Sequence, residues 1–167
     1  LLTRNGVRLA LLNYTYGTNG MPVPRGMIVN RIDTVRMAAD AAAARTAGAD
    51  FIVACLHWGN EYERRPNPAQ RSLACFLLQH GVDVVVGSHP HVVQPWEADS
   101  AHVVLYSLGN LVSNQRRRYT DGGLVAEVEA SRHPEGRMSY ALEVTPVWVA
   151  LPRYRILPPE AADTMAL

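Results

Sequence analysis

Three histidines follow buried strands at the points where the apolar pattern stops. His57 comes directly after the apolar run 51–56, and His89 and His91 follow the run 82–86 with a proline between them. Proline favours extended geometry in the residue before it, and side chains two apart in an extended segment face the same way. Neutral imidazole binds divalent transition metals at pH 7. We therefore predict that His57, His89 and His91 bind divalent ions such as manganese, zinc or iron.

Polar residues near the same strand ends offer further chemistry. Glu61 lies four residues after His57. Four roles are open to its carboxylate: a general base, an outer partner of the metal ligands, a metal ligand, or a solvated charge without function. Ser107 and Asn110 follow the apolar run 103–106. The Asn110 amide either orients substrate or water, or belongs to a plain turn. We predict catalytic roles for Glu61 and Asn110, and a substrate contact for Ser107.

A short basic cluster follows that strand end by a few residues. It consists of Arg116, Arg117 and Arg118, with Tyr119 beside them. The planar guanidinium fork matches the oxygens of carboxylates and phosphates. We predict that Arg116, which is nearest the strand end, contacts an anionic substrate. For Arg117 and Arg118 a solvated loop is the favoured interpretation.

The pattern along the chain alternates strands with helices and then continues in strands alone. Asp33 and Asn67 are helix-capping residues, and Gly48 and Gly81 end the helices that they begin. After Gly122 apolar and polar residues alternate as in antiparallel strands. The predicted strands are 7–14, 51–56, 82–86, 103–106, 124–130 and 138–150, and the predicted helices are 33–47 and 67–80. This βαβαββ order plus an antiparallel hairpin predicts an α/β fold, in which ligands bind beyond the C-terminal ends of the strands.

The bulk composition is that of an ordinary globular domain. The chain has 167 residues, of which 48% are hydrophobic and 19% charged, and its formal net charge is +1. Because there is no basic surplus, we predict no nucleic-acid partner. No apolar run approaches the roughly twenty residues that span a bilayer, and no targeting segment is recognisable. Since the chain starts at Leu1 without a methionine, we expect a fragment of a longer protein.

Four sequence segments together resemble a known family. They are NGVRLALLNYTYGTNG, LHWGNEY, GVDVVVGSHPHVVQPWE and LYSLGNLVSNQ, in this order. The chain resembles the bacterial CapA-type proteins of poly-γ-glutamate capsule biosynthesis, which belong to the calcineurin-like metallophosphatase superfamily. The resemblance implies a β-sandwich flanked by helices, with a metal centre at one edge of the sheets. It assigns metal-binding roles to His57, and to His89 with His91, although the Gly-Ser-His-Pro-His turn has one more residue than the superfamily's Gly-His-x-His.

The resemblance also implies a function. It points to biosynthesis of an anionic polymer at the bacterial cell envelope, with an anionic polymer or phosphoester as substrate and other capsule-synthesis components as possible partners. The superfamily's earlier motifs, which supply an aspartate, a further acidic or amide ligand and an Asn-His pair, have no counterpart in residues 1–167. We therefore expect the C-terminal part of a single domain, which alone binds metal weakly and lacks metal-dependent hydrolase activity. A general metallophosphoesterase and a non-catalytic polymer-binding module are the alternatives.

Overall fold

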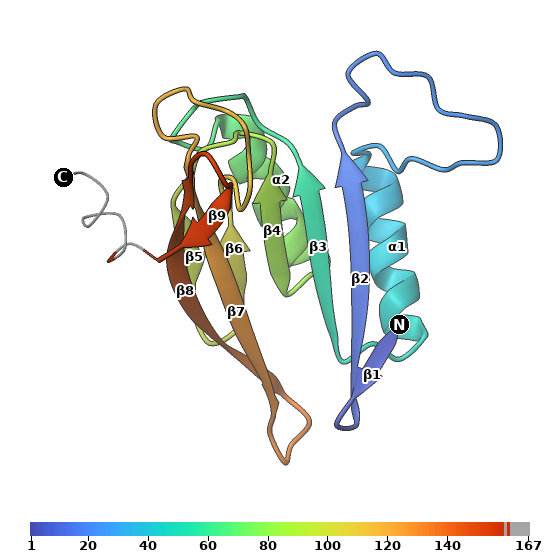
Figure 1. Ribbon diagram of the computed structural model, residues 1–167. Helices are drawn as coiled ribbons and strands as arrows, with labels where there is room; N and C mark the ends of the chain where they lie inside the picture. Colours follow the sequence, from blue (N-terminus) through green and yellow to red (C-terminus); the bar gives the residue numbers. More distant parts are fainter. Residues whose placement is uncertain (159, 161–167) are drawn as a thin grey trace.

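The computed structural model describes residues 1–158 and 160. It contains a six-stranded mixed sheet in the order β1-β2-β3-β4-β6-β5 and a three-stranded antiparallel sheet in the order β7-β8-β9 (Figure 1). The strands of the first sheet are β1 Leu2–Arg4, β2 Val7–Thr15, β3 Phe51–His57, β4 Val84–Ser88, β5 Trp96–Ala98 and β6 Val103–Leu105. Those of the second are β7 Gly122–Arg132, β8 Met138–Ala150 and β9 Arg155–Leu157. The predicted α/β class and the antiparallel hairpin are confirmed.

Two helices, α1 Thr34–Thr46 and α2 Pro68–Gln79, connect the parallel strands. Both begin at the predicted caps, because the Asp33 side chain accepts from the backbone N–H of Arg36, and Asn67 forms a reciprocal capping box with Gln70. The left-handed glycines 48 and 81 follow the helix ends. None of the described helices is long and apolar enough to cross a membrane.

The two faces of the large sheet are covered differently. Helices α1 and α2 pack on one face, and their apolar side chains form a core with Tyr14, Ile52 and Val85. The second sheet packs on the other face, where Tyr140 of β8 joins Val84 in a second core. Figure 1 shows the resulting order of helices, large sheet and small sheet. This agrees with the helix-flanked sandwich that the resemblance implies.

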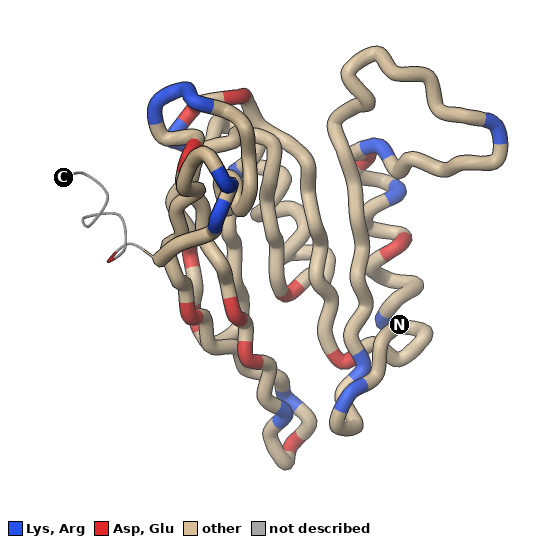
Figure 2. The backbone as a smooth tube through the Cα atoms, viewed as in Figure 1, with Lys and Arg blue, Asp and Glu red and all other residues tan. Residues whose placement is uncertain are grey.

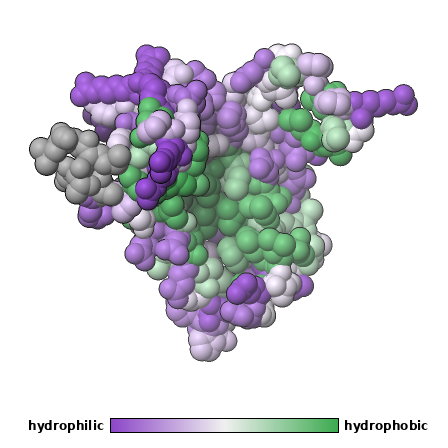
Figure 3. Space-filling view, in the orientation of Figure 1, coloured by the Kyte–Doolittle hydropathy of each residue, from purple (hydrophilic) through white to green (hydrophobic). Residues whose placement is uncertain are grey.

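The small sheet leaves much of β2 uncovered. Leu11 is 56% exposed on the side that faces away from the helices. An apolar cleft lies beside it, lined by Leu2, Leu9, Phe51 and Ala130 among others. Figure 3 shows this hydrophobic, hollowed surface in the middle of the molecule.

Parallel pairing brings the chemically interesting strand ends together. Strands β2, β3, β4 and β6 run parallel as neighbours, with Thr15 opposite His57 and His57 opposite Ser88. The C-terminal ends of these strands therefore lie at one edge, as predicted. The three-residue strands β1 and β5 were not predicted, because so short a segment shows no periodicity. Residues 152–159 were expected to be an edge or tail, and β9 is an edge strand within them; residue 159 lies outside the described residues.

Candidate metal centre

The turn after β4 holds its two histidines in unusual backbone conformations. His89 has a φ of 101° and His91 a φ of 59°. The predicted extended geometry before the proline is therefore wrong, and a tight turn takes its place. A non-glycine residue in this region costs about 1–3 kcal/mol and persists where the surrounding structure requires it, often at functional sites. Two such residues in one turn mark this strand end as a candidate site.

Packing around the last residues of β4 requires a glycine. The indole Nε1 of Trp58 donates to the carbonyl of Tyr106 over 2.9 Å, in the interior. A Cβ at Gly87 would lie 2.0 Å from that carbonyl oxygen and 2.4 Å from the indole nitrogen. Glycine is therefore required at this position, which precedes His89 by two residues.

The loop after β3 is tied to the histidine turn. The backbone N–H that follows Glu61 donates to the carbonyl of Pro90 over 2.7 Å. Behind it, the buried side chain of Gln70 donates to that of Gln94 over 2.9 Å, and Gln94 donates to the carbonyl of Glu63 over 2.8 Å. Because a fully hydrogen-bonded buried network is rigid, it holds the loop and its Glu61 carboxylate beside the turn.

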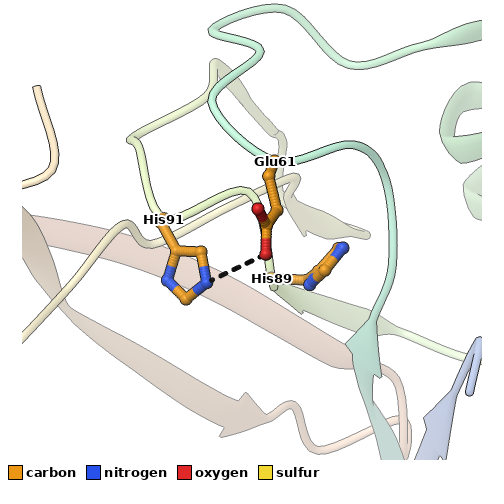
Figure 4. Close-up of side chains that lie close together, drawn as sticks. All are labelled: Glu61, His89 and His91. Carbon is orange, nitrogen blue, oxygen red and sulfur yellow. Dashed lines mark ion pairs between the residues drawn. The ribbon is translucent and has the colours of Figure 1, made fainter. Parts of the chain in front are cut away.

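Three potential ligands meet at this point. One donor atom each from Glu61, His89 and His91 lies within 4.8 Å of the other two. Figure 4 shows the carboxylate pointing toward His91, with the Nε2–Oε1 pair 3.8 Å apart. The structure thus brings together two of the three predicted metal ligands and the predicted carboxylate.

Asn110 orients His91. Its Nδ2 donates to the carbonyl of Thr120 over 2.8 Å, so its Oδ1 is the atom that lies 3.0 Å from His91 Nδ1. An amide oxygen only accepts, and therefore Nδ1 carries a proton, which in the neutral tautomer leaves the lone pair on Nε2. That lone pair is on the nitrogen that faces Glu61. Contacts of this kind orient metal-binding histidines in proteins, so the structure supports a positioning role for Asn110.

His57 lies at the side of this cluster. Its ring centroid is 4.6 Å from that of His89, although no His57 atom belongs to the three-residue group of mutually close donors. Tyr16, which was missed in the sequence, stacks on His57 at 5.7 Å and lies 4.6 Å from His89. It directly follows β2, whose end shares this edge, and that position was the signal for it.

Burial favours the neutral forms of His57 and His89. Burial lowers the pKa of His57, and the positive charge that His91 would carry lowers it further. Burial also lowers the pKa of His89, with His57 as the next cause. Since the unperturbed imidazole pKa is about 6.5, both rings are uncharged at pH 7. Neutral imidazole is the form that binds a metal ion.

Ser107 and Arg116, the two residues predicted to contact substrate, use their side chains in contacts within the protein. Ser107 is buried, and its hydroxyl donates to the carbonyl of Val92 over 2.8 Å while it accepts from the backbone N–H of Gly109. It supports the turn that carries Asn110, and a substrate contact does not fit this environment. Arg116 donates to the carbonyl of the residue before it over 2.6 Å and lies over the ring of Tyr154 at 5.7 Å.

Arg117 contacts a ring that itself packs against the metal-ligand cluster. Its guanidinium lies 4.1 Å from the centroid of the Tyr62 ring, and that ring stacks on His91 with centroids 6.2 Å apart. The contact with Tyr62, the neighbour of His91, thus comes from the second arginine of the basic cluster and not from Arg116. The fold of the 111–121 loop decides this, and no local pattern reveals it.

Comparison with known proteins assigns the family. Residues 1–115 match the family described as "Bacterial capsule synthesis protein PGA_cap". The chain belongs to this family. The PGA_cap match includes Glu61, the three histidines and Asn110, and it ends before Arg117.

Two named relatives accompany the PGA_cap match. Over 127 residues the chain is 34% identical to "Capsule biosynthesis protein CapA" of Bacillus anthracis. The aligned region covers 72% of this chain and 31% of that protein. Over 99 residues it is 39% identical to "PGA biosynthesis protein CapA" of Bacillus subtilis (strain 168), which covers 59% of this chain and 25% of that protein. The match thus spans less than a third of either relative.

The positioning role of Asn110 can be measured. Asn110→Ala removes the acceptor that holds the His91 proton on Nδ1, so the affinity for Mn²⁺ is expected to fall about 10- to 100-fold. Isothermal titration of the full-length protein measures this. Asn114→Ala, whose native side chain accepts from Tyr154 in the same loop region, is the control. Equal affinities for the two variants would show that Asn110 is only a turn residue.

Proposed function

We propose that Glu61, His89 and His91, with His57 beside them, bind a divalent metal ion, and that the protein uses it in the biosynthesis of an anionic capsule polymer. The observation that carries this proposal is the meeting of three donor atoms within 4.8 Å of one another in a chain of the PGA_cap family. Both relatives are named for capsule or PGA biosynthesis. Those names support a place in the cell envelope and a poly-γ-glutamate-like polymer.

The donor set fits such an ion. Two imidazoles and one carboxylate are the ligands of many catalytic zinc sites, and the same donors suit iron and manganese. The lowered pKa values of His57 and His89 keep their rings unprotonated. Three ligands leave coordination positions for water, for substrate or for His57. The strained turn supports the same interpretation, because it holds both histidines toward one carboxylate.

The chain's own residues would do the following work. When bound, a divalent ion supplies a water of lowered pKa and neutralises negative charge that develops on a phosphoryl or acyl group. Glu61 and His89 hold it, while Asn110 directs the His91 lone pair inward. Arg117, outside this set, would present positive charge to an anionic substrate beside Tyr62.

The test is restoration of the capsule in living cells. In a capsule-forming bacterium that lacks the gene, the wild-type full-length protein is expected to restore surface polymer, and Glu61→Gln and His89→Ala are expected to fail at equal protein levels. His102→Ala, a change in an exposed histidine beside Asp99, is expected to restore it. Full restoration by His89→Ala would overturn the metal-dependent function and favour a non-catalytic polymer-binding module. Rapid hydrolysis of simple aryl phosphates would favour a general metallophosphoesterase.

A further inference from the structure

A groove lies beside the metal-ligand cluster and is not part of it. Its volume is about 610 Å³, and its walls come from the loop after β3, the start of β5, the end of the arginine loop, and strands β7 and β8. The side chains with chemistry to offer are Arg64, Arg65, Trp96 and Tyr119. Trp96 and Tyr119 are each 43% exposed. The groove is therefore open to a ligand that arrives from solvent.

A band of alternating guanidinium and aromatic groups joins the groove to the cluster. Arg64 lies 4.3 Å from the centroid of the Tyr119 ring, and Arg118 lies 4.7 Å from the same centroid. Next to them, Arg117 lies over Tyr62, which stacks on His91. We call Arg64, Arg65, Arg117 and Arg118 the arginine band. Figure 2 shows the loop that carries its 117–118 part above the small sheet.

Within the part of the chain that the structure describes, no carboxylate pairs with the arginine band. No carboxylate oxygen of the described residues lies within 4.0 Å of a guanidinium nitrogen of the band. Asp121 also lines the groove, but its carboxylate accepts from the Trp148 indole over 3.0 Å. By contrast, Arg45 at the opposite edge of the sheet is 2.5 Å from Asp83. The chain as a whole has a net charge of only +1, so the band is a local concentration.

The geometry of the band favours carboxylates over bases. A guanidinium that lies flat on a ring keeps its N–H edges free for bidentate bonds to oxygen anions. The ring of Tyr119 is already covered by two guanidinium groups and that of Tyr62 by one. Those rings are thus not free platforms for the base stacking on which single-stranded nucleic-acid binding depends. The band therefore offers guanidinium forks rather than free ring faces.

We propose that the groove and the arginine band form an extended binding site for a linear polycarboxylate chain. The polymer lies along the band, so that several carboxylates contact arginines while one unit sits at the metal-ligand cluster. This inference rests on the proposed function, and it adds a place of polymer contact outside the metal centre.

The experiment measures binding of labelled γ-linked glutamate oligomers to the full-length protein by fluorescence anisotropy. The variant Arg64→Ala/Arg65→Ala is expected to bind a long oligomer about tenfold more weakly, which corresponds to about 1.4 kcal/mol, and to bind free glutamate and Mn²⁺ as the wild type does. Added salt is expected to reduce the difference in oligomer affinity between the wild type and this variant, because salt screens exposed charges. Arg64→Lys/Arg65→Lys keeps the charge without the guanidinium fork. Its affinity for the oligomer is expected to lie between those of the wild type and the alanine variant.

The controls separate this proposal from the metal proposal. Arg137→Ala removes an arginine that lies 3.5 Å from Glu135 in the distant β7–β8 turn, and it is expected to bind the oligomer like the wild type. A double variant that is folded, binds Mn²⁺ and retains full oligomer affinity would overturn the polycarboxylate site. If the wild type does not bind Mn²⁺ but still binds the oligomer in an arginine-dependent way, only the metal centre is overturned. A single-stranded oligonucleotide that binds as tightly as the glutamate oligomer, and weakens equally in the variant, would overturn the assignment to polycarboxylates.

Discussion

Replacing His89 or His91 with alanine is expected to lower the affinity of the full-length protein for Mn²⁺ by more than about 100-fold. In the proposed metal centre each change removes a direct ligand, whereas loss of an outer partner alone typically costs about 10- to 100-fold. Titration calorimetry on metal-free protein measures the effect. Glu61→Ala is expected to have a similar effect, because its carboxylate is the one acidic group in the three-donor cluster.

A matched control keeps this prediction specific. His102→Ala makes the same change at an exposed histidine that precedes β6, at the opposite edge of the sheet. Its Mn²⁺ affinity is expected to equal that of the wild type. The metal-free His89 and His91 variants are expected to unfold at temperatures close to that of the wild type, because both side chains are partly exposed and the bonds that they lose form only with the ion. Mn²⁺ affinity that survives at wild-type strength in folded His89→Ala would contradict the assignment.

Gly87→Ala is expected to lower the free energy of unfolding by at least about 1–3 kcal/mol, the usual cost of an extra methyl group in a packed core. The added carbon would lie 2.0 Å from the Tyr106 carbonyl oxygen. Strands β4 and β6 must then separate, and this disturbs the bond that the N–H of Leu108 donates to the Gly87 carbonyl. Urea denaturation followed by circular dichroism measures the change.

Gly17→Ala is the comparison for this substitution. An added Cβ there meets only Arg31, at 3.6 Å, and its backbone is not in the left-handed region. Its stability is expected to stay near that of the wild type. A Gly87→Ala protein that unfolds at the same urea concentration as Gly17→Ala would show that the packing between Trp58 and Tyr106 adapts easily.

Local signals in the sequence predicted the framework of the fold. Asp33 and Asn67 cap the two helices as expected, since capping depends on a side chain and the backbone three residues away. The apolar runs gave the parallel strands to within two residues, and the alternation after Gly122 gave the hairpin. Strand β5, by contrast, depends on its partner β6 for its formation, and three residues carry too little pattern to be recognised.

The site was predictable in its histidines but not in its detailed contacts. His57, His89 and His91 follow strand ends, which is a local property. That Glu61 meets two of them depends on the bond from the following N–H to the Pro90 carbonyl, between segments far apart in the sequence. The sequence also did not reveal that Arg117, and not Arg116, contacts Tyr62. The path of the loop determines which guanidinium reaches that ring.

The central claim is that Glu61, His89 and His91 are ligands of one metal ion. Anomalous diffraction from crystals of the full-length protein grown with Mn²⁺ tests it most directly. The expected result is an anomalous peak at bonding distance from the Glu61 carboxylate, a ring nitrogen of His89 and Nε2 of His91. Manganese peaks elsewhere in well-ordered crystals, with none between these three side chains, would contradict it.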